Sequence, residues 1–537
     1  MTLDHRHLRT LAAPTLLAFA LVVASTAVVT TAAADSAKGG PEVSNAVHHD
    51  TSRPLRDLPS LGRSTILREQ PRRPLPFAPS TGAPDTAVQT TAGPSIVTTA
   101  GLSVPGVGNG DYGFAPNAAP PDPSGAVGAT QYVQWVNESF AVFNKTTGAI
   151  APGFPKTGNT IWSGFPGNCA TRNDGDPIVQ YDKVAGRWVL TQFSVPSGGP
   201  YEQCVAVSQT SDALGAYNRY SFSYGTQFND YGKLAVWPDG YYMTYNMFNS
   251  ANTFIGSKAC AFDRTAMLNG TTATQQCYQL SASYGGLLPS DLDGTVAPPA
   301  GSSNYLMNFG TNSLNVWKFH VDFTTPANST FSSSPTSVPV AAFTPACGGG
   351  ACIPQAGTST KLDSLADRLM YRLAYRHFAD GHEALVVNHS VKTSGSKRAE
   401  VDGVRWYEIR LTSGTPSVFQ QGTYAPGDGA SRWMGSIAMD KVGDVAVGYS
   451  TSSPTLNPSI RYTGRTPTDA LGTLQAENTI LTGGGSQNGN LHRWGDYSAM
   501  SVDPVDDCTF WYTNEYEKTT GSFNWSTQIA SFKFPSC

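Results

Sequence analysis

The chain has 537 residues and a formal net charge of −4 at pH 7, and only 14% of its residues are charged. A weakly acidic chain lacks the basic surface that nucleic acid or an anionic membrane requires, so neither partner is expected. The 54 glycines and the 11% of aromatic residues are typical of an all-β protein with many turns.

The N-terminal residues predict an export signal. Basic residues lie between His5 and Arg9, the stretch from Leu11 to Val29 is apolar and lacks carboxylates, and Ala32 to Ala34 offer a cleavage site. We therefore expect residues 1–34 to be a signal peptide and the mature protein to be secreted, extracellular and monomeric, without a membrane span. A membrane anchor is the alternative interpretation of the same apolar stretch.

Residues 35–93 are rich in Pro, Arg, Ser and Thr and show no hydrophobic period. This composition predicts a disordered leader, a linker or a removable pro-segment.

From residue 94 to residue 537 one pattern recurs: a charged residue opens a strand, a turn follows, and a second apolar strand ends before a small polar residue or glycine. Steps of roughly 50–80 residues are typical of repeats that stack on one another. The sequence therefore predicts an all-β, seven-bladed β-propeller of four-stranded antiparallel blades. The second strands end at Val136-Asn137, Phe193-Ser194, Tyr245-Asn246, Phe309-Gly310, Val387-Asn388, Tyr449-Ser450 and Tyr512-Thr513.

The last blade lacks an outer strand, because only three residues follow Phe534. An unpaired strand edge is prone to aggregation. We expect the segment from Ser95 to Val104 to supply the missing strand, so that the N-terminal part of the domain closes the ring.

The eight cysteines are even in number and belong to an exported chain, which favours disulfides. Sequence alone leaves the connectivity open, and no Cys or His spacing fits zinc. The pairs nearest in sequence are Cys169–Cys204, Cys260–Cys277, Cys347–Cys352 and Cys508–Cys537.

Charged residues at the starts of the inner strands should surround one mouth of the propeller. Carboxylates gathered in this way shift each other's pKa values and bind cations or substrate. In the alternative interpretation, each aspartate bonds to backbone amides of its own turn or of the next blade and fixes the register, which is favoured for Asp122. The set comprises Asp122, Asp176, Asp230, Asp293 and Asp496, joined by Tyr371, Arg372 and Arg432.

Aromatic residues accompany these charges. A flat ring beside carboxylates and arginines suits a sugar, although the same rings can instead fill gaps between blades. The residues expected to bind substrate are Arg372, Arg432, Trp433, Arg493, Trp494, Tyr231 and Tyr497.

Charged residues at the starts of inner strands, repeated in this way, resemble the secreted sialidase-like and related glycan-active propellers. The resemblance covers roughly residues 95–537 as architecture. It implies a glycan substrate, and a trio of arginines formed by Arg372, Arg432 and Arg493 would hold a substrate carboxylate. The Asp-box turn of sialidases, SxDxGxTW, does not occur in this chain.

The most favoured function is therefore a glycoside hydrolase acting on an extracellular glycan. Such enzymes use one carboxylic acid to protonate the leaving oxygen and a second carboxylate to attack or to activate water. We expect Asp176, Asp230, Asp293 and Asp496 to include these groups, with Glu515 in the wider pool of carboxylates.

Two other functions stay open: a non-catalytic propeller that binds a glycan or a surface protein, and a polysaccharide lyase. A lyase would use a Tyr or His base beside an arginine, for which Tyr371, Arg372, His389 and Tyr497 are available. The GxSxG and HExxH motifs do not occur. No cofactor is expected, and the only metal considered is a structural calcium at the acidic turn Asp503–Asp507.

Overall fold

The computed structural model describes residues 40–76, 80–396 and 399–537. All of them belong to one folded unit, Ser36–Cys537. The expected signal peptide, residues 1–34, lies outside the described residues. Within the described ranges, no helix is long and apolar enough to cross a membrane.

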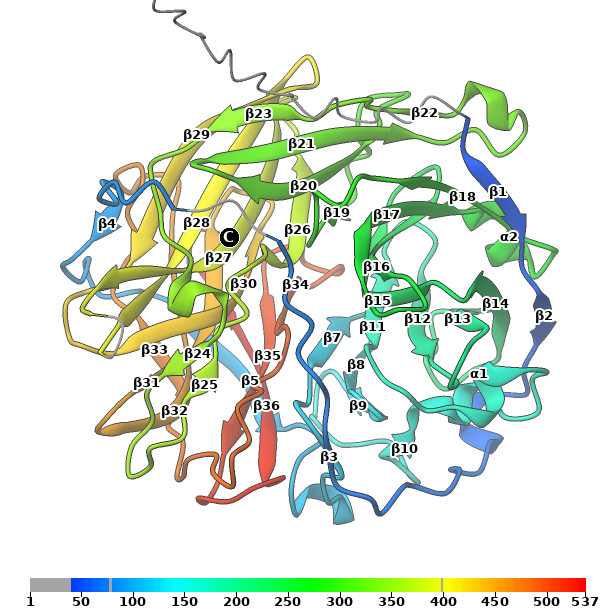
Figure 1. Ribbon diagram of the computed structural model, residues 1–537, viewed down its shortest axis with the longest axis horizontal. Helices are drawn as coiled ribbons and strands as arrows, with labels where there is room; N and C mark the ends of the chain where they lie inside the picture. Colours follow the sequence, from blue (N-terminus) through cyan, green and yellow to red (C-terminus); the bar gives the residue numbers. More distant parts are fainter. Residues whose placement is uncertain (1–39, 77–79, 397–398) are drawn as a thin grey trace, which may run out of the picture. The chain divides into compact units, whose positions relative to one another are not determined.

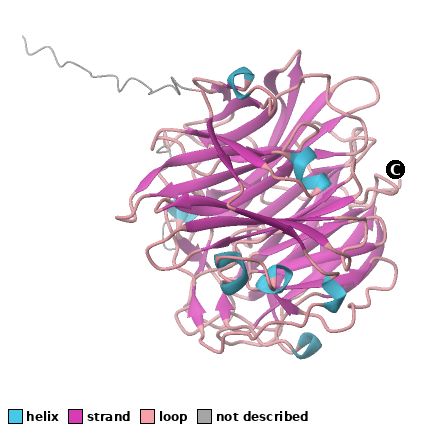
Figure 2. Ribbon diagram, turned by 90° about the vertical axis from the view of Figure 1, so that its right-hand side faces the viewer, coloured by secondary structure: helices cyan, strands magenta, loops and turns pink. Residues whose placement is uncertain are grey.

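The described part of the chain is nearly all-β, as the composition predicted, and Figure 2 shows how little of it is helical. The two α-helices are α1 (Asn168–Thr171) and α2 (Arg264–Asn269). The 3₁₀ turns are η1 (Leu55–Asp57), η2 (Asp111–Gly113), η3 (Gly158–Trp162), η4 (Pro326–Asn328) and η5 (Ala346–Gly349).

Three antiparallel sheets come first in the chain. Each has a core of three or four consecutive strands, and most of these are joined by turns at which Asp, Gly or Pro interrupts the apolar runs. The second and third sheets each gain an edge strand from the N-terminal segment. In sheet order the strands of the three sheets are β7 (Pro123–Val127), β8 (Gln131–Val136), β9 (Ser139–Asn144) and β10 (Lys156–Thr157); β11 (Ile178–Asp182), β12 (Arg187–Ser194), β13 (Tyr201–Ser208), β14 (Tyr217–Gly225) and β2 (His48–Thr51); β15 (Phe228–Val236), β16 (Tyr241–Phe248), β17 (Phe254–Phe262), β18 (Thr274–Gln279) and β1 (Glu42–Asn45).

Two further groups of strands are joined into one ten-stranded sheet by a parallel pairing between β19 and β26, and the pairings within each group are antiparallel except that of β4 with β29. The first group is β19 (Leu288–Asp293), β20 (Asn304–Gly310), β21 (Ser313–His320), β22 (Thr330–Phe331) and β23 (Thr336–Pro339); the second is β26 (Met370–His377), β27 (Glu383–Ser394), β28 (Val401–Thr412), β29 (Thr415–Tyr424) and β4 (Val88–Gln89).

The last two four-stranded sheets complete the series. They are β30 (Ser431–Met439), β31 (Val445–Ser453), β32 (Leu456–Arg465) and β33 (Asn478–Leu481); and β34 (Ala499–Val502), β35 (Phe510–Glu517), β36 (Trp525–Lys533) and β5 (Thr99–Pro105). Two short pairings lie outside them: β3 (Arg68–Glu69) with β6 (Ala118–Ala119), and β24 (Ala351–Ile353) with β25 (Leu362–Asp363).

The first strands of successive groups contact one another in chain order, and β34 contacts β7. These strands lie toward the centre of Figure 1, whereas β14, β18 and β29 lie further out. Strands such as β11 and β31 are buried along their whole length, since sheets cover both of their faces. Packed between the sheets are large side chains such as Trp188, Trp237 and Trp406.

The disorder expected for residues 35–93 is wrong where the structure describes them. Strands β1, β2 and β4 add to the edges of β18, β14 and β29. Such edge pairing depends on backbone hydrogen bonds, so it needs no apolar period in the sequence. The predicted pairing of the segment 95–104 with the last strand is confirmed, because β5 lies antiparallel to β36 with Val104 opposite Ile529.

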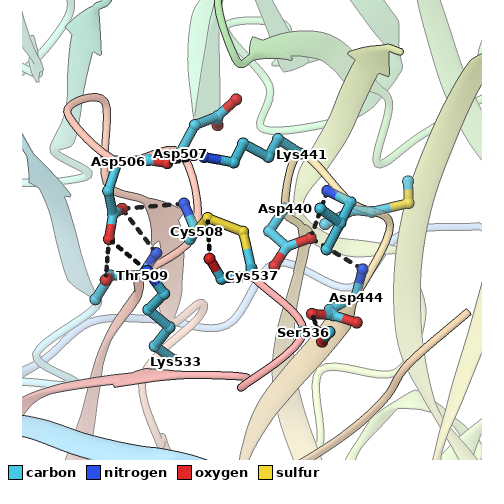
Figure 3. Close-up of a disulfide and its surroundings, with 12 residues drawn as sticks. Asp440, Lys441, Asp444, Asp506, Asp507, Cys508, Thr509, Lys533, Ser536 and Cys537 are labelled. Atoms are coloured by element: carbon cyan, nitrogen blue, oxygen red, sulfur yellow. Dashed lines mark hydrogen bonds and ion pairs between the residues drawn. A yellow bond between two sulfur atoms is a disulfide. The ribbon is translucent and has the colours of Figure 1, made fainter. Parts of the chain in front are cut away.

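The sequence left the disulfide connectivity open, and the four disulfides of the structure are the four pairs nearest in sequence. The Cys508–Cys537 bond ties the last residue to the start of β35 (Figure 3). Ser536, beside it, donates a hydrogen bond to Asp444, which anchors the C-terminal segment on the preceding sheet.

Candidate functional site

Four aspartates gather around one small cavity, which we call the mouth. They are Asp122, Asp176, Asp230 and Asp496. Asp230 lies near the start of β15, and the other three lie just before the first strands of their sheets, β7, β11 and β34. The cavity volume is about 40 Å³. Since one water occupies roughly 10–15 Å³ on this measure, the cavity has room for about three waters. The other lining residues are Gln70, Pro71, Arg73, Phe193, Leu365, Arg368 and Arg493.

The backbone before β7 and β11 adopts an uncommon conformation that directs two of these carboxylates. Asp122 and Asp176 both have φ of 48°, in the left-handed region. Aspartate tolerates this region better than most residues, and such conformations cluster at functional sites. Gly175 precedes Asp176 with φ of 98°, and a Cβ there would lie 1.7 Å from Asn137 Oδ1.

Two of the carboxylates also tie neighbouring sheets together. Asp122 Oδ1 accepts the backbone N–H of Asp496 at 2.7 Å, and Asp176 Oδ2 accepts the N–H of Tyr231 at 3.0 Å. These contacts are the register bonds considered for aspartates at strand starts. Asp230 and Asp496 accept no backbone N–H among the described residues; Asp230 faces Arg73 at 3.6 Å and Asp496 pairs with Arg493.

A lysine lies beneath the aspartates. Lys233 Nζ sits 3.5 Å from the ring centre of Tyr231 and 4.0 Å from that of Tyr497. The residue is fully buried, and burial lowers its pKa to about 8 although Asp176 and Asp496 oppose the shift. The repeat pattern did not single out Lys233, although a lysine within strand β15, just before its apolar end, is the feature of the sequence that points to it.

The carboxylates of the mouth bind protons more tightly than ordinary aspartates. Burial raises the pKa of Asp230 to about 7, with a further rise from Asp176 that Arg73 and Arg368 counteract. Burial also raises the pKa of Asp122, to which Asp496 adds, and that of Asp176, which Lys233 opposes. The mouth therefore contains an acid that changes charge near neutral pH.

Arg368 is a second residue that sequence reasoning missed. Its guanidinium pairs with Asp367 at 2.8 Å and lies 4.4 Å from the ring centre of Tyr231. It lies two residues before the start of β26, in a loop for which the repeat pattern gave no alignment.

Asp293 and Arg372 do not lie at the mouth, which corrects the prediction for both. Asp293 ends β19 instead of opening it, so it lies at the opposite end of its strand. There it pairs with Arg372 and Lys183, and Arg372 Nε also contacts Asp291 Oδ2 at 2.8 Å. We call these four residues the inner network. Burial would raise the pKa of Asp293, but Arg372 and Lys183 outweigh it and hold the pKa below its ordinary value.

Arg432 also lies elsewhere. Its buried guanidinium pairs with Asp428 at 2.7 Å and with Glu477 at 2.8 Å, between β29 and β33. The expected trio of arginines is therefore not assembled: of Arg372, Arg432 and Arg493, only Arg493 lines the mouth.

The aromatic residues expected to stack on a sugar are buried. Trp433 and Trp494 are 0% exposed and pack against each other with ring centres 6.1 Å apart. Tyr231 and Tyr497 are 3% and 1% exposed, and their hydroxyls donate to backbone carbonyls. These rings fill gaps between sheets, which is the alternative interpretation given to them above.

The acidic turn considered for calcium has its carboxylates engaged by protein donors. Asp503 binds Lys145 at 2.8 Å, Asp506 accepts from Thr509, and Asp507 pairs with Arg376 at 2.7 Å. This donor set suits ion pairs and turn bonds more than a cation with six or more oxygen ligands.

No protein-family model and no curated protein matches the chain. Among solved structures it is similar to an ulvan lyase, described as a new family of polysaccharide lyase, with TM-score 0.36 and 12% identity over 78% of this chain and 93% of the lyase. It is also similar to an exo-β-1,3-galactanase from Clostridium thermocellum, with TM-score 0.31 and 10% identity over 78% of this chain and 81% of the galactanase. The WD40 domain of SCAP from fission yeast has TM-score 0.32 and 7% identity over 75% of this chain and 82% of that domain. Similarities this low carry no argument about activity, and the likeness to sialidases stays a prediction.

Proposed function

We propose that this chain is a secreted glycoside hydrolase and that the mouth is its active site. The observation that supports this most is the proton affinity of Asp230, whose pKa is about 7 beside the further carboxylates Asp176 and Asp496. Hydrolysis of a glycosidic bond needs a carboxylic acid that is protonated near neutral pH and a second carboxylate close by.

The roles follow from the partners of each group. Asp230 is the general acid, since it is the mouth carboxyl with a pKa near neutrality and without a backbone bond. Asp496 pairs with Arg493 and is the candidate nucleophile or base. Asp176 and Asp122 are each bound to a backbone amide and hold the mouth together. The charge of Asp176 adds to the rise in pKa that burial causes at Asp230 and at Asp122.

We also propose that the seven repeats close into one propeller ring. This is supported by the chain-order contacts of the first strands, including β34 with β7, and by the pairing of β5 with β36. An experimental map with seven sheets around one axis would agree, and a gap between β34 and β7 would contradict it.

The test of activity is a panel of extracellular polysaccharides, with reducing ends and ultraviolet-absorbing products measured separately. Asp230→Asn and Asp496→Asn should each lower turnover by about 10²-fold or more, the usual contribution of a positioned acid or base. Turnover should fall as pH rises through about 7, because Asp230 then loses the proton that it donates. Asp380→Asn, an exposed aspartate beside His382, is the matched control and should leave turnover unchanged.

A non-catalytic glycan-binding protein is the second candidate. It is favoured by the backbone bonds of Asp122 and Asp176, which give these carboxylates a structural role. In that case the protein would retain a polysaccharide without releasing reducing ends. Unsaturated products absorbing in the ultraviolet would instead indicate a lyase.

A further inference from the structure

The N-terminal segment 68–76, which we call the strap, runs over the mouth and contributes Gln70, Pro71 and Arg73 to the lining of its cavity. In Figure 1 this part of the chain leads away from β3 across the front of the folded unit. The cavity beneath it holds about 40 Å³, so a sugar ring has no room while the strap is in place.

The first half of the strap is fixed by backbone bonds. Arg68 and Glu69 pair with Ala118 and Ala119 of β6. The carboxylate of Glu69 accepts the backbone N–H of Arg493 at 2.9 Å. In return, Arg493 Nη1 donates to the carbonyl of Gln70 at 2.9 Å. One arginine of the mouth is thus shared between Asp496 and the strap.

The second half is held by a pair of buried aspartates and by Arg368. Arg72 lies 3.1 Å from carboxylate oxygens of both Asp363 and Asp367. Asp367 Oδ2 also accepts the N–H of Leu75 at 3.0 Å, and the side chain of Leu75 is buried. Arg368 Nη2 donates to the carbonyl of Arg73 at 3.2 Å.

Arg73 is the charged residue of the strap that lines the mouth. Its guanidinium faces Asp230 at 3.6 Å and lies 4.4 Å from the ring centre of Phe228 and 5.7 Å from that of Phe248. Three other cations act on the four aspartates: Lys233 of β15 and the loop residues Arg368 and Arg493, of which Arg368 also pairs with Asp367. Arg73 is a fourth cation, and it comes from the strap. The guanidinium of Arg73 is therefore held by the carboxylate of Asp230 and by the faces of two aromatic rings.

Exposed stretches lie on both sides of the strap. Residues 64–67 precede it, and residues 80–84 follow. Neither stretch belongs to a sheet. The strap can therefore leave the mouth without removing a strand from the large sheets, because its one short pairing is with β6.

We propose that the strap is a plug supplied by the chain itself, which keeps the mouth closed until the strap is displaced. The ligand that then enters would be the glycan substrate of the proposed hydrolase, so this part of the inference rests on the proposed function. Arg72 and Arg73 hold the plug in place, and their loss opens the mouth in the intact chain.

The test compares the full chain with Arg72→Ala/Arg73→Ala and with the control Arg56→Ala. Arg56 belongs to the same N-terminal segment and pairs with the exposed Asp212, away from the mouth. Hydrogen exchange of strap peptides, which include the bonded amides of Gln70 and Leu75, is followed by mass spectrometry. Exchange should be at least tenfold faster in the double variant and unchanged in the control and in the sheets.

Turnover of a glycan found in the panel is the second measurement, and it should rise at least tenfold in the double variant. Strap amides that already exchange in the wild type as fast as residues 80–84 would overturn the plug. Measurable turnover that is equal in the wild type and the double variant would overturn it as well. If the strap responds as expected and no glycan is turned over by either form, the plug stands and the hydrolase proposal fails. If the double variant does not fold, the single variant Arg73→Gln replaces it. Strap exchange and turnover are then compared with those of the wild type in the same way.

Discussion

The mouth and the inner network are both buried sets of aspartates and cations, yet they are built in opposite ways. In the inner network, Arg372 and Lys183 pair with Asp291 and Asp293, and all four residues come from strands or from the turn directly after β11. In the mouth, four aspartates face Lys233 of β15 and the loop residues Arg368 and Arg493, and a further cation, Arg73, comes from the strap. The comparison shows that residues of the strands and their turns complete the charge pairing of the inner network. The mouth takes one of its cations from the strap, which we propose can be displaced.

One carboxylate of each site shows this difference in its pKa, whereas burial raises the pKa of Asp291 in the inner network although Arg372 and Lys183 oppose the rise. Paired with two cations, Asp293 has a pKa below its ordinary value. Asp230, buried beside Asp176, has a pKa of about 7. A carboxylate kept ionised over the whole physiological range serves as a structural counter-ion, whereas one that titrates near neutrality is suited to proton transfer.

The largest effect should come from breaking the inner network. Arg372→Met leaves two buried carboxylates with Lys183 alone, and removal of one partner from a buried ion pair costs about 3–5 kcal/mol. Urea unfolding at neutral pH should show this loss. Arg56→Met, which breaks an exposed pair, should cost less than about 1 kcal/mol. Equal losses in the two variants would mean that the inner network is solvated and that the comparison fails.

A smaller effect should come from the backbone that positions the mouth. Gly175→Ala places a methyl group against Asn137, whose side chain also donates to Asp122 at 3.4 Å. Left-handed backbone strain and displacement of Asn137 should together cost about 1–3 kcal/mol. The control is Gly164→Ala, with φ of 76° and no atom within 4 Å, which should cost about 1 kcal/mol. Turnover should fall in Gly175→Ala and not in Gly164→Ala. A larger loss of stability and turnover in Gly164→Ala would contradict the placement of Asp122 and Asp176.

Part of this site could be predicted from the sequence. Asp122, Asp176, Asp230 and Asp496 each come just before an apolar strand or at its start, so aligning the repeats was enough to bring them together. The same alignment failed for Asp293, because the inner strand of that repeat is the segment that ends at Asp293, not the one that follows it.

Other parts depended on information that one sequence does not carry. The side chains of Arg432 and Trp433 point to opposite faces of β30, and a repeat pattern does not say which face meets the mouth. The strap was missed because it is held by backbone bonds and single ion pairs, which leave no period in the sequence.

The most direct test of the contrast between the two sites is a titration of aspartate carboxyl carbons by NMR, with ¹³C-labelled aspartate in the intact chain. Asp230→Asn and Asp293→Asn assign the two signals. The account predicts that the Asp230 signal titrates near pH 7, protonated below and ionised above, while the Asp293 signal shows no titration above about pH 4. Titration of Asp230 below pH 5 would contradict the assignment of the mouth as a site of proton transfer.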